Sequence, residues 1–249
     1  MTDGPRLLDW DSRFFGFTVV DAVSSDPDGG DLARVTAQAG EMGASLLVYT
    51  KPMGPLLAPR TGVRHVDIRH TYVCDFSKLG FDRSGISGLI EFHDGRESSP
   101  EIDQLGILSG IHSRFFTDPL FPRKAADGLY IAWVRRALSR DFGDHVLVAR
   151  DPTGEIAALY SGRIDANGIG VPDLMSVLPH FRGHSLGTGF FKRSMLHFRD
   201  RGILQGRLKS QGRNQFARAI YESLGWTLEA REDVYHVWLK EPVVKDTYL

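Results

Sequence analysis

The sequence has few of the residues that mark disulfide-bonded, metal-rich or nucleic-acid-binding proteins. A single cysteine, Cys74, excludes an internal disulfide and a cysteine-rich metal site. The nine histidines show no metal-ligand spacing, so we expect no metal. The formal net charge of -1 gives no global basic field, so we expect neither nucleic acid nor an anionic membrane as a partner. No apolar run has signal-peptide or membrane-spanning length, which favours a cytoplasmic, soluble protein.

The composition is that of a globular protein with a substantial core. Hydrophobic residues make up 42% of the 249 residues and charged residues 24%, which suits one large domain or two modest ones. In the first half, aromatic, β-branched and periodic patterns predict a small α/β unit with strands at 14–23, 45–51 and 66–76 and a helix at 31–43. The Gly-, Ser- and charge-rich segment 78–100 is the expected linker, which gives an N-terminal domain at 1–90 and a catalytic domain at 101–249.

The second half predicts an α+β fold with a mixed, mostly antiparallel central sheet. Turn signatures in Asp151-Pro152-Thr153-Gly154 and Asn167-Gly168 indicate an antiparallel meander. The helices are expected at 101–116, 124–142, about 186–200 and about 214–224, and the strands at 145–150, 156–164, 169–177, 203–209 and 234–239.

A glycine-rich stretch, HFRGHSLGTG at 180–189, precedes one of these helices. Glycine-rich turns that open helices often bind phosphates through backbone N–H groups. A nucleotide P-loop needs lysine followed by Ser or Thr, which this stretch lacks. The spacing of Gly183, Gly187 and Gly189 also differs from the dinucleotide fingerprint. A different phosphate ligand is therefore indicated.

Residues 177–187 resemble the acetyl-CoA motif of the GNAT superfamily of N-acetyltransferases, V-x-P-x-x-(R/Q)-G-x-G-x-(G/A), with Ser185 as the one departure. The resemblance implies the GNAT fold, acetyl-CoA as co-substrate, and a bulge before the loop that separates the strand from its neighbour. Together with the segment described next, it implies these cofactor-binding residues: Met175, Ser176, Val177, Arg182, Gly183, His184, Ser185, Leu186, Gly187, Asn214 and Ala217.

The segment NQFARAIYESLGW at 214–226 resembles the later N-x-x-A-x-x-x-Y-x-x-x-G-(F/W) segment of the same superfamily. A spacing of seven returns to about the same helix face, so Asn214 and Tyr221 share one side. The tyrosine is the expected catalytic residue, because a phenol with a reference pKa of about 10 stays protonated and can donate to a departing thiolate. Asp173, His112, His180 and a water relay remain open as the base.

The acceptor is suggested by a narrower resemblance. LDWDSRFFGF at 8–17 and SRFFTDPLFP at 113–122 are similar to segments of TDP-fucosamine acetyltransferases. This implies a partial acetyltransferase-like N-terminal domain, a homodimer, and acetylation of a nucleotide-linked amino-deoxy sugar. Protein, antibiotic or polyamine acceptors and a silent CoA-binding module remain alternatives. The residues predicted to contact the acceptor are Phe15, Arg114, Asp118 and Asp173.

Overall fold

A computed structural model describes residues 4–141 and 143–242. Within these ranges, ten strands form one mixed sheet in the order β1-β2-β3-β10-β4-β9-β8-β7-β6-β5. Only β2–β3 and β8–β9 are parallel among the described neighbours, which confirms the predicted α+β fold with a mostly antiparallel sheet. The strands are β1 (Arg6–Leu7), β2 (Val19–Val23), β3 (Leu46–Pro52), β4 (Val63–Asp75), β5 (Ile90–Phe92), β6 (His145–Arg150), β7 (Ile156–Ile164), β8 (Gly170–Val177), β9 (Gln205–Gln211) and β10 (Thr227–Trp238).

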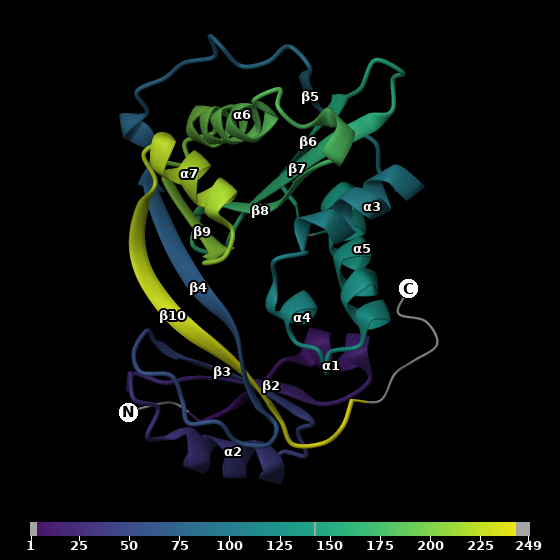
Figure 1. Ribbon diagram of the computed structural model, residues 1–249. Helices are drawn as coiled ribbons and strands as arrows, with labels where there is room; N and C mark the ends of the chain where they lie inside the picture. The colour runs from purple at the N-terminus through teal and green to yellow at the C-terminus, as the bar shows by residue number, and fades with distance from the viewer. Residues whose placement is uncertain (1–3, 142, 243–249) are drawn as a thin grey trace.

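The helices cover different parts of this sheet (Figure 1). One core cluster lies under α1, α3, α4 and α5, a second under α6 and α7, and a third under α2. None of the described helices is long and apolar enough to cross a membrane. The helices are α1 (Asp9–Phe15), α2 (Leu32–Glu41), α3 (Pro100–Ser109), α4 (Arg114–Thr117), α5 (Arg123–Ser139), α6 (Leu186–Asp200) and α7 (Gln215–Ser223), with 3-10 turns η1 (Phe76–Lys78) and η2 (Pro179–Phe181).

The C-terminal strand joins the two halves of the chain. β10 lies between β3 and β4 and pairs with both in antiparallel fashion. In Figure 1, β4 and β10 run from β2, β3 and α2 at one end to α7 at the other. One sheet runs through both 1–90 and 101–249, and strand pairing is continuous between them. The division of the chain into these two domains therefore stays a prediction.

The expected strand at 14–23 was wrong in its first part. Residues Asp9–Phe15 form α1, and the strand begins only at Val19. Acidic residues in the first turn favour the helix, and Gly16 ends it in the left-handed conformation with its N–H donating to Ser12 O. Trp10 and Phe14 stack at 5.1 Å, the spacing of residues one turn apart. Aromatic content alone was therefore a misleading strand signal.

The expected helix at 101–116 is two helices. α3 ends before Gly110, whose Cβ position would overlap the ring of Tyr130 on α5, and α4 begins at Arg114. The helix expected at 124–142 ends at Ser139, and its expected last residue, Phe142, lies outside the described residues. The break after α3 turns Arg114 toward the centre of the molecule, where it lines a cavity.

A buried ion pair joins three strands at the junction of the two halves. Lys51 on β3 and Asp233 on β10 are almost fully buried, and their Nζ and Oδ2 atoms are 2.9 Å apart. Lys51 also donates to Pro27 O at 2.8 Å, and His65 Nε2 on β4 is 3.0 Å from Asp233 Oδ1. Both charged groups of the pair thus have further hydrogen-bond partners, which offset the cost of burying the two charges.

We expect Lys51→Met to lower the free energy of unfolding by about 3–5 kcal/mol, because it leaves the Asp233 carboxylate buried without its cation. Urea denaturation followed by circular dichroism measures this. The matched control is Arg6→Met at the exposed Arg6–Asp21 pair, which should cost less than about 1 kcal/mol. Equal losses of unfolding free energy in the two variants would contradict the conclusion that the buried Lys51–Asp233 pair stabilises the fold.

Candidate active site

The end of β8 is separated from its parallel neighbour. Among the described residues, β8 pairs with β9 only at Gly170 opposite Gly206. On its other side β8 stays paired with β7, and a bulge opposite Ser161 interrupts that register, with Leu174 N–H donating to Ser161 Oγ at 3.2 Å. Bulges bend a strand and increase its twist. The backbone of Met175–Val177 therefore presents an edge without a ladder partner on β9, and the bulge that the family resemblance implied is present.

The loop after β8 exposes backbone donors. Gly183 and Ser185 have φ values of 89° and 52°, both in the left-handed region, and residues 182–185 are exposed. The amide of Gly189 bonds to Ser185 O at 3.0 Å as α6 begins. Amides before this point have no acceptor within a helix, and the helix dipole adds partial positive charge there. This arrangement suits a phosphate or pyrophosphate group.

Side chains around the loop support its shape. Arg182 Nε donates to Val177 O at 3.3 Å, and His184 Nδ1 lies 3.1 Å from Phe181 O. A Cβ on Gly187 would lie 2.7 Å from Cδ1 of Ile220. Glycine at this position therefore lets α6 and α7 approach each other closely.

Helix α7 and its N-cap bring three predicted residues to the same place. Asn214 caps the helix, its Oδ1 accepting a hydrogen bond from Ala217 N–H at 3.1 Å. Ala217 and Tyr221 are buried, and the Tyr221 ring lies 5.3 Å from Tyr72 and 5.2 Å from Phe191. These rings fix the phenol in one orientation.

A cavity of about 400 Å³ lies where these elements meet. Its walls come from β4, β8, β9, the α3–α5 side and α7. The remaining predicted cofactor residues do not line this cavity; they are Ser176, Val177 and Arg182–Gly187. The Ser176 side chain instead donates a hydrogen bond from Oγ to Leu105 O at 2.7 Å. Six predicted site residues line it: Arg114, Asp173, Met175, Asn214, Ala217 and Tyr221.

The electrostatics of Tyr221 suit a proton donor. Burial raises the pKa of its phenol, and a hydrogen bond with the Ser210 side chain opposes that rise only in part. The hydroxyl therefore remains protonated at neutral pH. A protonated phenol in a shielded cavity can donate to an anionic leaving group.

Of the three side chains considered as the base, Asp173 lines the cavity and the two histidines do not. Its side chain is 19% exposed and lies 3.0 Å from Arg163 Nε. Burial raises its pKa to about 6, although Arg163 opposes the rise. His112 is exposed, and His180 is 62% exposed with Nε2 3.7 Å from Asp151 Oδ2. A carboxylate with this pKa is ionised at neutral pH and can accept a proton.

Two predicted substrate residues lie elsewhere, which corrects the sequence interpretation. Phe15 is 1% exposed in the core, with its ring centroid 5.0 Å from that of Phe121. Asp118 is buried at the end of α4 and accepts hydrogen bonds from His236 Nδ1 at 2.7 Å and Trp238 Nε1 at 2.8 Å. Both residues hold the helices against β10, and neither lines the cavity.

The structure adds charged cavity residues that sequence reasoning missed, chiefly Asp67 and Arg69 on β4 and Lys209 on β9. The available signal was the alternation of residues 66–76, which put apolar side chains on one face and charged ones on the other. In the structure the charged face is covered from the α3–α5 side, and Asp67 is 7% exposed.

The chain was compared with known proteins. No family model matches it. The spore coat polysaccharide biosynthesis protein SpsD of Bacillus subtilis (strain 168) is 28% identical over 129 residues, which is 51% of this chain and 43% of that protein, so less than half of the relative is matched. A GCN5-related N-acetyltransferase from Sphaerobacter thermophilus superposes with a TM-score of 0.58 at 13% identity, over 98% of this chain and 78% of that chain. A tandem GNAT protein from the clavulanic acid biosynthesis pathway has a TM-score of 0.53 at 15% identity, over 92% and 76%.

The chain has the GNAT fold. The predicted fold is therefore confirmed. It contains the separated strands β8 and β9, with the loop and α6 between them along the chain, as the motif resemblance implied. The likeness extends over nearly the whole chain, including the N-terminal strands.

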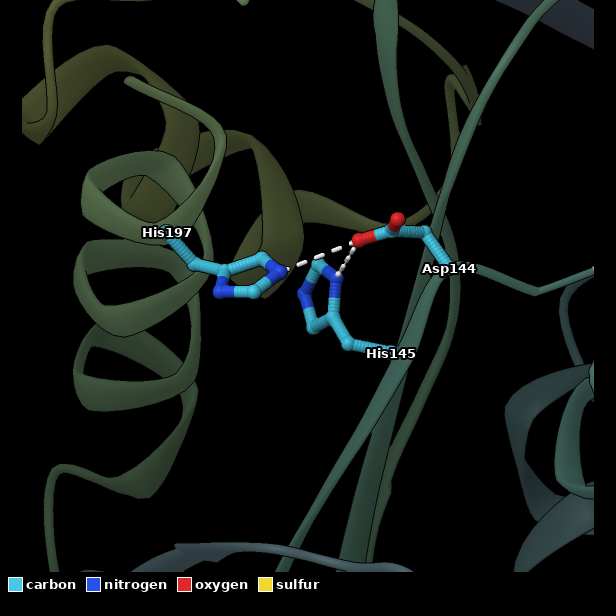
Figure 2. Close-up of side chains that lie close together, drawn as sticks. All are labelled: Asp144, His145 and His197. Atoms are coloured by element: carbon cyan, nitrogen blue, oxygen red, sulfur yellow. Dashed lines mark hydrogen bonds and ion pairs between the residues drawn. The ribbon is translucent and has the colours of Figure 1, made fainter. Parts of the chain in front are cut away.

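One polar cluster of the described residues lies away from the cavity (Figure 2). Asp144 and His145 on the β6 side and His197 on α6 place possible metal-ligating atoms within 4.8 Å of one another, a grouping that sequence spacing missed. Asp144 Oδ2 lies 3.0 Å from both His145 Nδ1 and His197 Nε2, and Arg201 pairs with Oδ1. His145 Nε2 is 2.9 Å from Ser194 Oγ.

This cluster is best interpreted as a cross-link between β6 and α6. Burial raises the pKa of Asp144, but hydrogen bonds from both histidines and the Arg201 charge together hold it below its usual range. Burial lowers the pKa of His145, so the neutral ring donates from Nδ1 to Asp144. The nitrogens that would face an ion already donate to the carboxylate.

We expect Ser185→Gly to retain activity and to weaken acetyl-CoA binding by only about two- to threefold, less than one good hydrogen bond is worth. Glycine adopts the left-handed conformation of residue 185 without the cost of about 1–2 kcal/mol that a Cβ brings. Calorimetric titration measures the affinity. The contrasting variant is Gly187→Val, which should weaken binding more because its side chain meets Ile220. A loss above about tenfold in Ser185→Gly would mean the hydroxyl contributes more than one ordinary hydrogen bond.

Proposed function

We propose that this protein is an acetyl-CoA-dependent N-acetyltransferase that acts on the amine of a nucleotide-linked amino-deoxy sugar. The observation that carries the acetyl-transfer part is the position of Tyr221, a buried phenol in a cavity beside the unpaired edge of β8. The acceptor class rests on the resemblance of segments 8–17 and 113–122 and on a relative named for polysaccharide biosynthesis.

The residues present fit acetyl-CoA. The amides of Gly183–Gly187 and the N-terminus of α6 would hold its pyrophosphate, with Arg182 beside them. The free backbone edge at Met175–Val177 would hydrogen-bond the pantetheine arm, because that edge lacks a strand partner on β9. The small side chain of Ala217 leaves room along α7, whereas a larger residue would fill the cavity wall. When bound, acetyl-CoA supplies the activated acetyl group.

The chain's own groups would handle the protons of the reaction. The Asp173 carboxylate accepts a proton from the acceptor's ammonium, directly or through water, so that a neutral amine is available. A backbone N–H near Val177 polarises the acetyl carbonyl and stabilises the oxyanion that forms there. Tyr221 would donate its phenolic proton to the sulfur that leaves, and the proton that the nitrogen loses as the amide forms would restore the phenol, directly or through water. The pKa directions of Asp173 and Tyr221, one ionised and one protonated at neutral pH, match these roles.

The mixed charge of the cavity bears on the alternatives. Polyamines need a predominantly acidic site, but Arg69, Arg114 and Lys209 line this cavity alongside Asp67 and Asp173. A silent CoA-binding module would not need a shielded phenol opposite a carboxylate. The proposed partial acetyltransferase-like domain at the N-terminus is supported by the likeness of this chain to a tandem GNAT protein. The proposed homodimer is supported only by the resemblance to TDP-fucosamine acetyltransferases.

An acceptor screen with purified protein tests the substrate assignment. Thiol release from acetyl-CoA should be fastest with TDP- or UDP-linked amino-deoxy sugars. Turnover of peptides, aminoglycosides or polyamines with none on any nucleotide amino sugar would overturn the acceptor class and leave acetyl transfer intact. Absence of thiol release with every acceptor, despite acetyl-CoA binding, would favour the binding module.

We expect Tyr221→Phe to lower kcat by about 10²–10⁴-fold, the usual contribution of a positioned general acid. The acetyl-CoA Kd should stay unchanged because the ring remains in place. Tyr72→Phe is the matched control, since its buried hydroxyl has no hydrogen-bond partner among the described residues and does not line the cavity. Stopped-flow and steady-state thiol assays measure both, and undiminished turnover in Tyr221→Phe would refute the general-acid role.

We expect kcat to rise with pH through about 6 and then level off, because Asp173 must be ionised to accept a proton and burial raises its pKa to about 6. Asp173→Asn should lower the plateau by about 10²-fold or more and remove this limb of the profile. A pH–rate profile of both proteins with saturating substrates measures it. An identical limb and plateau in the variant would assign the base to a different group.

A further inference from the structure

Two cavity residues of opposite charge carry polar atoms that the rest of the protein leaves unsatisfied. Asp67 on β4 is 7% exposed, and its Oδ1 has no hydrogen-bond partner among the described residues. Arg114 at the start of α4 has its Nε shielded from solvent and equally without a partner there. Both residues line the cavity that contains Tyr221. The acetyl-transfer roles proposed above use neither of them.

Two other charged residues of the same cavity, Asp173 and Arg69, each have an ion-pair partner. Asp173 pairs with Arg163 at 3.0 Å, and Arg69 Nε pairs with Glu232 Oε2 at 2.9 Å. A buried polar atom of a charged group that has no hydrogen-bond partner destabilises the folded state, so proteins rarely retain one unless a ligand completes it. Unsatisfied groups of both signs in one cleft indicate a binding site for a molecule that carries both charges.

We propose that Asp67 and Arg114 form a two-charge acceptor subsite, in which Asp67 binds the ammonium group of the acceptor and Arg114 binds an anionic oxygen group of the same molecule. The anion is a phosphate or a carboxylate, since a guanidinium pairs with either. This inference rests on the proposed N-acetyltransferase activity and specifies its acceptor as an amine that also bears a negative charge. A nucleotide amino sugar, with its diphosphate, is one member of that class.

The local electrostatics agree with a subsite that waits for its ligand. Burial raises the pKa of Asp67 to about 6, while a hydrogen bond from the Ile68 backbone and the charges of Arg114, Arg213 and Arg69 oppose the rise. Burial lowers the pKa of Lys209 on the same wall, and the charges of Arg69 and Arg207 add to the effect while Glu232 and Asp21 oppose it. An ammonium placed beside Asp67 would favour its ionised form, so acceptor binding should weaken as pH falls below about 6.

The two carboxylates of the cavity then have separable roles. Asp67 holds the acceptor, so its loss should raise KM, whereas loss of Asp173 should lower kcat. Arg114 is a recognition residue that sets which acceptors bind.

The test uses three acceptors built on one sugar: a 4-amino-4,6-dideoxyhexose 1-phosphate, its neutral methyl glycoside, and a methyl glycoside of a 4-amino-4-deoxyhexuronic acid, which carries a carboxylate. KM and kcat are measured with saturating acetyl-CoA for the wild type, Arg114→Gln, Arg114→Lys and Asp67→Asn. Acetyl-CoA affinity of each variant, measured by calorimetry, shows that it is folded.

For the wild type we expect KM of at least one anionic acceptor to be about tenfold or more below that of the neutral glycoside, the value of one charge-assisted hydrogen bond. Arg114→Gln should remove this preference, and Arg114→Lys should keep part of it. Asp67→Asn should raise KM for all three acceptors and remove the loss of affinity below pH 6. The anion whose preference depends on Arg114 identifies phosphate or carboxylate as the group bound.

Equal wild-type KM values for charged and neutral acceptors, or a preference that survives Arg114→Gln, would overturn the subsite. If Arg114→Gln does not fold, an unchanged preference in Arg114→Lys would overturn it instead. If none of the three is acetylated, the proposed acceptor class fails separately. In that case, calorimetry measures how tightly the 1-phosphate and the hexuronic acid glycoside bind to the CoA-saturated protein. The subsite predicts that at least one of them binds more weakly to Arg114→Gln or Arg114→Lys than to the wild type, and equal binding would overturn it.

Discussion

The separation of β8 from β9 is the constraint on which the rest of the site depends. A parallel pair would normally continue its hydrogen bonds along both strands, but here the pairing stops after Gly170 and Gly206. On the other side of β8, the bulge opposite Ser161 bends the strand, and Ser161 Oγ on β7 accepts the hydrogen bond of Leu174 N–H that the interrupted β7–β8 ladder would otherwise satisfy. An open strand edge inside a protein needs an occupant, and the cavity beside it gives one room.

The same separation explains why residues distant in sequence meet. The gap admits α7 from one side and the α3–α5 helices from the other, so Tyr221 and Arg114 line one cavity. β4 contributes Asp67 because β10 and the buried Lys51–Asp233 pair hold β4 and β3 in a single sheet. The N-terminal strands therefore support the cavity wall that β4 forms, while Phe15 and Asp118 act through packing and hydrogen bonds within the core.

Local signals in the sequence were enough for the meander, the loop and α7. The strand at 145–150 is found with those bounds, and the helix expected at about 214–224 is found at Gln215–Ser223. Its helical spacing had placed Asn214 and Tyr221 on one side. The first helix was missed although Gly16 and the acidic first turn marked it, because aromatic content was given more weight.

Other features depend on pairing between distant segments, which spacing alone does not specify. The insertion of β10 between β3 and β4 joins β4 to one sheet, in which the α3–α5 side covers Asp67. The packing of α6 near β6 brought His197 to Asp144.

Hydrogen exchange of backbone amides with and without acetyl-CoA tests the central claim most directly, because it reports on the free edge of β8 itself. The account predicts that acetyl-CoA slows exchange in peptides covering 173–178 and 182–188, while peptides from β2 and β3 change little. Unchanged exchange at both segments in the presence of saturating acetyl-CoA, or protection confined to the N-terminal strands, would contradict the account.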